Sequence, residues 1–93
     1  MSVLIVGGDK LGKIPERLSK CGFSCIKHVS GRKCQNCRVD QRTDMVLVLT
    51  DYVGHNLCEV VKSKAKEKEI PVLFSRRSWS NIYKKLNFCG FLN

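Results

Sequence analysis

The sequence predicts an α/β protein: a three-layer, Rossmann-like or flavodoxin-like parallel sheet of about four strands, ordered 2-1-3-4, with helices on both faces. Residues 45–49 are five apolar residues without alternation, which is typical of a central parallel strand buried on both faces. Shorter apolar runs alternate along the chain with segments of helical periodicity, and this favours a parallel sheet. The 93 residues, 43% of them hydrophobic, are therefore expected to form a single domain, 1–93.

The chain is expected to begin with a strand and a helix. Residues 3–6 form the strand, which ends at Gly7-Gly8. Pro15 lies in the first turn of the helix, where its missing N–H does little harm. Gly22 is predicted to end this helix as a left-handed cap.

A second strand and a crossover are expected next. Residues 23–29 form the strand, with Phe23, Cys25 and Lys27 on one face. The polar segment 33–44 must then carry the chain to the central strand. Because a right-handed crossover needs about a dozen residues, we expect a short, imperfect helix in this segment.

After the central strand, the pattern predicts a helix, a fourth strand and a last helix. The first helix covers about 54–68, and the strand covers 70–74 with Pro71 at its start, where a missing donor is tolerated. Ser78 is expected to cap the last helix. Apolar residues recur at helical spacing in both helices: Leu57, Val60, Val61 and Ala65 in the first, and Trp79, Ile82, Tyr83 and Leu86 in the second.

The charge balance is strongly basic. The chain has seventeen Lys and Arg residues and eight Asp and Glu residues, which gives a formal net charge of +9. Such a charge favours phosphates, other anionic ligands or nucleic acid as partners, although a solvated surface also accounts for it. No helix-turn-helix pattern and no RNP-type strand accompanies it. No segment is long and apolar enough to cross a bilayer, and no signal-peptide pattern is present, so a cytoplasmic protein without membrane association is expected.

Polar residues gather where the predicted strands end. Because the carboxyl ends of parallel strands meet at one edge of a sheet, these residues form a candidate ligand-binding site. Both histidines of the chain fall in this set, although each could simply bridge a loop. No catalytic triple is readable from the spacing. The candidate ligand-binding residues are Gly7, Gly8, Asp9, His28, Ser30, Gly31, Arg32, Thr50, Asp51, His55, Asn56, Ser75, Arg76, Arg77 and Ser78.

The six cysteines suggest metal or redox chemistry rather than structural disulfides, given a cytosolic chain. Cys34 and Cys37 form a CxxC motif between basic residues, which lower a thiol pKa. Zinc and a redox-active pair both stay open, but a second CxxC is missing, and unlinked thiols are the favoured interpretation. Cys25 and Cys89 are expected in the core.

Most of the chain, from residue 1 to about 86, resembles the bacterial domain-of-unknown-function 2325 family. The matching segments are 4–8 with Pro15 following, 28–32, 44–55 and 71–80. The resemblance implies a small Rossmann-like domain with two histidine motifs, which match His28 and His55. In some relatives it also implies haem binding and a response to oxygen, so these histidines are candidate metal ligands. Cys34 and Cys37 depart from the family's pattern.

Three function classes remain open. The preferred one is a non-catalytic sensor or ligand-binding module, with haem, a metal or a phosphate-bearing molecule at the strand ends. The second is an enzyme acting on a nucleotide or phosphorylated substrate, although residues 7–12 match neither GxGxxG nor the P-loop pattern. The third is a basic adaptor that associates with nucleic acid. A homodimer is expected, since Trp79, Phe88, Phe91 and Leu92 could form an apolar patch.

Overall fold

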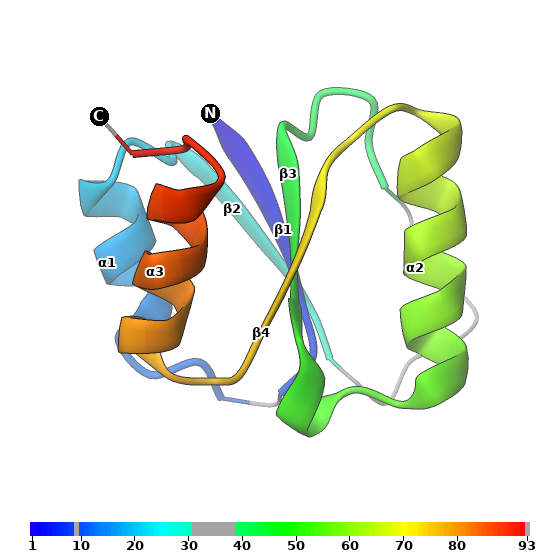
Figure 1. Cartoon of the computed structure of the whole chain (residues 1–93), viewed down its shortest axis with the longest axis horizontal. Helices are drawn as coiled ribbons and strands as arrows, with labels where there is room; N and C mark the ends of the chain where they lie inside the picture. The colour runs from blue at the N-terminus through cyan, green and yellow to red at the C-terminus, as the bar shows by residue number, and fades with distance from the viewer. Residues whose placement is uncertain (9, 31–38, 93) are drawn as a thin grey trace.

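A parallel four-stranded sheet in the order β2-β1-β3-β4 organises the protein (Figure 1). The computed structural model describes residues 1–8, 10–30 and 39–92, except for the side chains of Tyr52 and His55. The predicted α/β fold and strand order are confirmed. The elements are β1 (Ser2–Val6), α1 (Ile14–Lys20), β2 (Cys25–Val29), β3 (Met45–Leu49), a 3-10 turn η1 (Thr50–Tyr52), α2 (His55–Glu67), β4 (Val72–Ser75) and α3 (Trp79–Phe88).

Helices cover both faces of the sheet: α1 and α3 lie side by side on one face, and α2 lies on the other (Figure 1). All five residues of β3 are buried. Met45, Leu47 and Leu49 face α1 and α3, whereas Val46 and Val48 face α2. The prediction of a central strand buried on both faces is confirmed. None of the helices in the described ranges has the length and hydrophobicity needed to cross a membrane.

The ends of α1 and α3 test the two predicted helix caps, at Gly22 and Ser78. Gly22 has a φ of +104° just after α1, as expected for a left-handed cap. Ser78 occupies the N-cap position of α3, but its side chain makes no capping hydrogen bond. Its Oγ lies 3.2 Å from Ser80 Oγ instead, which leaves the first N–H groups of α3 without a side-chain partner.

The expected faces of the second strand are partly wrong. Phe23 is fully buried in the core beneath α1 and α3. Lys27 is paired in register with Leu4, which belongs to the core beneath α2. The two side chains therefore lie on opposite faces, because pairing with β1 begins only at Cys25, after the turn at Gly22. Cys25 and Cys89 are both exposed, so their expected burial is also wrong.

The crossover from β2 to β3 contains no helix between residues 39 and 44; residues 31–38 lie outside the described ranges. Val39 is buried against the α2-face core. The backbone then turns, with Thr43 N donating to Asp40 O over 3.0 Å. Asp44 accepts a hydrogen bond of 2.7 Å from Ser2 N at the start of β1. Beside α2, this face of the sheet is thus covered by a short loop.

We expect Leu47→Ala to lower the free energy of unfolding by about 2–5 kcal/mol, because the side chain is fully buried in the central strand. Urea unfolding followed by circular dichroism measures this. Phe88→Ala is the control: Phe88 is 90% exposed, and its removal should change stability by less than about 0.5 kcal/mol. Similar losses in the two variants would contradict the placement of the core.

Candidate functional site

The loop between β1 and α1 has an unusual backbone at the carboxyl edge of the sheet. Gly7, Gly8 and Gly12 have φ values of +110°, +75° and +58°. Residues with a Cβ rarely adopt such values, so glycine is what lets the chain turn sharply here. A Cβ added at Gly8 would meet only ordinary contacts, at 3.8 and 3.9 Å, so backbone conformation rather than space explains this residue.

His28 holds this loop from the side of β2. Its Nε2 lies 3.0 Å from Gly7 O and 2.9 Å from Gly8 O. Because both partners are acceptors, Nε2 carries a proton and acts as the donor in both contacts. The contact arises because His28 is paired in register with Ile5, two residues before Gly7. Metal ligation through Nε2 would require the loss of both hydrogen bonds.

Arg77 holds the same loop from the side of β4. Its Nε donates to Lys10 O over 2.8 Å, and its Nη2 donates to the same carbonyl. Its backbone N–H donates to Asp51 Oδ2 over 3.3 Å, just after β3. Arg77 therefore connects three loops that are far apart in the sequence.

Together, His28 and Arg77 fix the directions of three peptide carbonyls in this loop. A planar trans peptide directs its N–H opposite to its C=O. The N–H groups of Gly8 and Leu11 thus lie opposite the carbonyls of Gly7 and Lys10, which His28 and Arg77 hold. Neither N–H donates a hydrogen bond within the described part of the chain. Fixed, unpaired amides of this kind can bind anions.

The N-termini of α2 and α3 also lie at this edge (Figure 1). Their N-cap residues, Gly54 and Ser78, make no side-chain capping hydrogen bond. Helix N-termini carry unpaired N–H groups and a partial positive charge. The helices therefore add to the preference of this edge for negative charge.

Three of the remaining predicted site residues form a second group beside β4. Thr50 Oγ1 donates to Ser75 O over 3.4 Å, and Ser75 Oγ donates to Arg76 O over 3.0 Å. These three residues line a groove of about 670 Å³ with side chains of α3, hereafter the β4–α3 groove. The predicted strand-end pool is thus divided between the β1–α1 loop and this groove.

Several predicted residues lie outside the described ranges: Asp9, Gly31, Arg32, Cys34 and Cys37, together with the side chain of His55. Asn56 is described and lies exposed in the first turn of α2. Cys21, Cys25, Cys58 and Cys89 are free thiols. Among the described residues, no group of three or more His, Cys, Asp or Glu side chains is placed to hold a metal ion.

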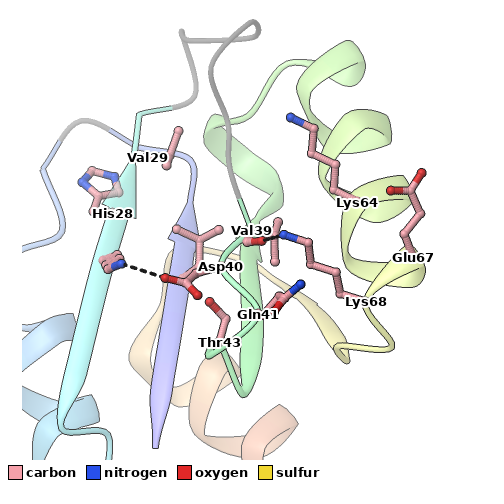
Figure 2. A pocket seen from close by; sticks show the side chains of 11 residues that line it. His28, Val29, Val39, Asp40, Gln41, Thr43, Lys64, Glu67 and Lys68 are labelled. Atoms are coloured by element: carbon pink, nitrogen blue, oxygen red, sulfur yellow. Dashed lines mark hydrogen bonds and ion pairs between the residues drawn. The ribbon is translucent and has the colours of Figure 1, made fainter.

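A groove that the sequence did not predict lies between β2 and α2 (Figure 2). Its volume is about 1000 Å³, and lysines and carboxylates line it together. Lys68 Nζ donates to Val39 O, and Lys27 Nζ lies 3.7 Å from Asp40 Oδ2. The Arg42 backbone N–H and then Lys27 lower the pKa of Asp40. The carboxylates of Asp40 and Glu67 offset the lysines of this groove, so the strand-end loop is the stronger candidate site for an anion.

The one sequence signal for this groove is the polar, poorly patterned composition of residues 33–44. Sequence reasoning also missed Lys10 and Leu11. These two residues contribute backbone atoms to the site, and a pattern of side chains in the sequence does not reveal the positions of backbone atoms.

Comparison with family models gives a match over most of the chain. The model described as "Uncharacterized protein conserved in bacteria (DUF2325)" matches residues 2–89. That range includes all four strands and the three α-helices named above. Comparisons with curated proteins and with solved structures gave no match.

His28→Ala and Arg77→Ala should each lower the free energy of unfolding by about 1 kcal/mol, because each removes side-chain donors from part-buried or loop carbonyls. They should also speed hydrogen exchange of the loop amides at residues 8–12 while leaving β3 protected. Amide exchange measured by NMR checks both effects. Lys20→Ala, at the far end of α1, is the control and should change neither quantity. Unchanged exchange in His28→Ala would show that the ring does not hold the loop.

Proposed function

The chain belongs to the DUF2325 family of bacterial proteins, and we propose that it is a non-catalytic module that binds a phosphate-bearing ligand at the carboxyl edge of its sheet. The observation that carries this proposal is the β1–α1 loop, whose carbonyls are held by His28 and Arg77. The N–H groups of Gly8 and Leu11, on the opposite sides of these peptides, have no hydrogen-bond partner among the described residues. A loop that is already ordered loses little entropy when it binds a ligand.

The charges around the loop support an anion. The guanidinium of Arg77 donates to a carbonyl and makes no ion pair with a carboxylate of the described residues, so its charge is not neutralised there. Lys10 lies in the loop itself. The N-termini of α2 and α3 add partial positive charge. The one described carboxylate in these contacts belongs to Asp51, which accepts the N–H of Arg77.

The donors also favour phosphate over a metal ion or haem. Amide N–H groups and a guanidinium donate hydrogen bonds and cannot ligate a cation, whereas a phosphate group accepts several such bonds at once. Nε2 of His28 already donates to two carbonyls, so a metal could be ligated only through the Nδ1 of this ring while both contacts are kept. These hydrogen bonds also give His28, one of the two strand-end histidines, a structural role that requires no bound metal or haem.

The expected homodimer has less support than the sequence suggested. Trp79, Phe91 and Leu92 pack against the core beneath α1 and α3. Of the four residues of the expected apolar patch, this leaves Phe88 as the strongly exposed one. The homodimer stays a prediction, and light scattering at high protein concentration would test it through the mass.

Titration with inorganic pyrophosphate tests the proposed site. We expect saturable NMR shifts of the amides of Gly8 and Leu11 and of the first turns of α2 and α3. Arg77→Ala should weaken binding by roughly tenfold, the effect of losing a charged hydrogen-bond donor.

Lys20→Ala is the matched control because it removes the same charge from the opposite edge. It should change the affinity by less than about twofold, since exposed charges far from a site are screened. Equal losses in the two variants, with shifts spread over all lysines, would show that only net charge acts and would favour the nucleic-acid adaptor. Hydrolysis of pyrophosphate or of an added nucleotide would instead favour the enzyme.

A further inference from the structure

β4 is an outer strand of the sheet, and no strand of the described residues pairs with one of its edges. On its inner side, Pro71 O accepts a hydrogen bond of 3.0 Å from Val46 N of β3. Because alternate residues of a strand direct their N–H and C=O groups to the same side, Leu73 and Ser75 also face β3. Val72 and Phe74 therefore direct their N–H and C=O groups to the free edge.

A groove lies on each side of this edge. The β4–α3 groove contains Arg76, Lys84 and Lys85, and Phe88 at its border is 90% exposed. A second groove of about 620 Å³ lies on the α2 side and contains Lys62 and Lys66. In Figure 1, β4 passes in the foreground between α3 and α2. Residues of β4 line both grooves.

The side chains around this edge are apolar at the strand and basic beside it. Phe74 lines both grooves, and Lys62 Nζ lies 5.7 Å from the centre of its ring. Five cations flank the strand, whereas Glu69 is the one carboxylate among the residues that line either groove. Lys62 has an ion pair, at 3.8 Å from Glu59 Oε1. The other four make no ion pair with a described residue.

The charge decides which occupant suits this edge. A second copy of the chain would bring the same five cations to the interface, and like charges placed face to face are costly. Lysines and Pro71 beside an edge also hinder pairing of identical copies. A single-stranded nucleic acid offers charge and stacking but leaves the outward carbonyls of Val72 and Phe74 without donors along its backbone. An acidic polypeptide satisfies both the carbonyls and the cations.

We propose that the free edge of β4 binds an extended, acidic peptide segment of a partner protein as a fifth strand. The peptide backbone pairs with the outward groups of Val72 and Phe74. Since side chains alternate along a strand, its carboxylates reach Lys84 and Lys85 on one face and Lys62 and Lys66 on the other. An apolar residue of the peptide covers Phe88. This proposal uses neither the β1–α1 loop nor a bound phosphate, and it stands independently of the proposed ligand.

A synthetic peptide of about nine residues tests the proposal; it has Glu at adjacent positions, so that both faces carry carboxylates, and one Val to cover Phe88. Its length is roughly that of one strand and its flanks. In the ¹⁵N spectrum of the full chain we expect saturable shifts at Val72, Phe74 and the last turn of α3. Lys85→Glu should weaken binding by roughly fivefold or more, because it places like charge at the interface. Lys20→Glu makes the same charge change on α1 and should stay within about twofold.

Two altered probes separate strand addition from simple charge attraction. A peptide with N-methyl groups on alternate residues keeps every carboxylate but loses the donors to the β4 edge, so its binding should be lost. This readout needs no change in the protein and cannot be confused with unfolding. Undiminished binding of the N-methylated peptide would overturn the proposal. So would tighter binding of an oligothymidine of similar length, absence of binding at low salt, or doubling of the mass without peptide.

Discussion

Burial of β3 on both faces is the constraint on which the rest of the structure depends. Five consecutive apolar residues leave no face of this strand for water, so each face needs its own layer of helices. The two cores that result share β3 between them. Its backbone is paired with β1 on one side and β4 on the other, so its position determines where every other strand lies.

The parallel direction of the strands then brings distant loops to one edge. His28 reaches the carbonyls of Gly7 and Gly8 because β2 is paired with β1 in one particular register. A slip of one residue would direct the ring to the opposite face. Arg77 completes the arrangement from the far side of β3. The candidate site is therefore a loop whose carbonyls are held by side chains from both sides, and the proposed anion would bind the amides opposite them.

The proposed ligand and the proposed peptide use basic residues at two separate places in this architecture. At the carboxyl edge, Arg77 and the helix N-termini surround a small loop, which suits a small anion. Along β4, lysines from α2 and α3 flank an open strand edge, which suits an extended acidic chain. The net charge of +9 is therefore compatible with two distinct binding hypotheses, and the composition alone could not distinguish them.

The sequence by itself determined the strand order, the doubly buried central strand, the glycine cap at Gly22 and the gathering of polar residues at one edge. These features depend on local periodicity and on the parallel connection, which short stretches of sequence report. Only the tertiary structure decided that His28 Nε2 donates to two carbonyls, that Arg77 holds Lys10, and that Thr50, Ser75 and Arg76 belong to a different groove. It also decided that Phe23 and Lys27 face opposite sides and that Ser78 leaves α3 uncapped. The physical reason is that the partner of a side chain depends on how segments distant in sequence pack together. The local sequence pattern does not determine that packing.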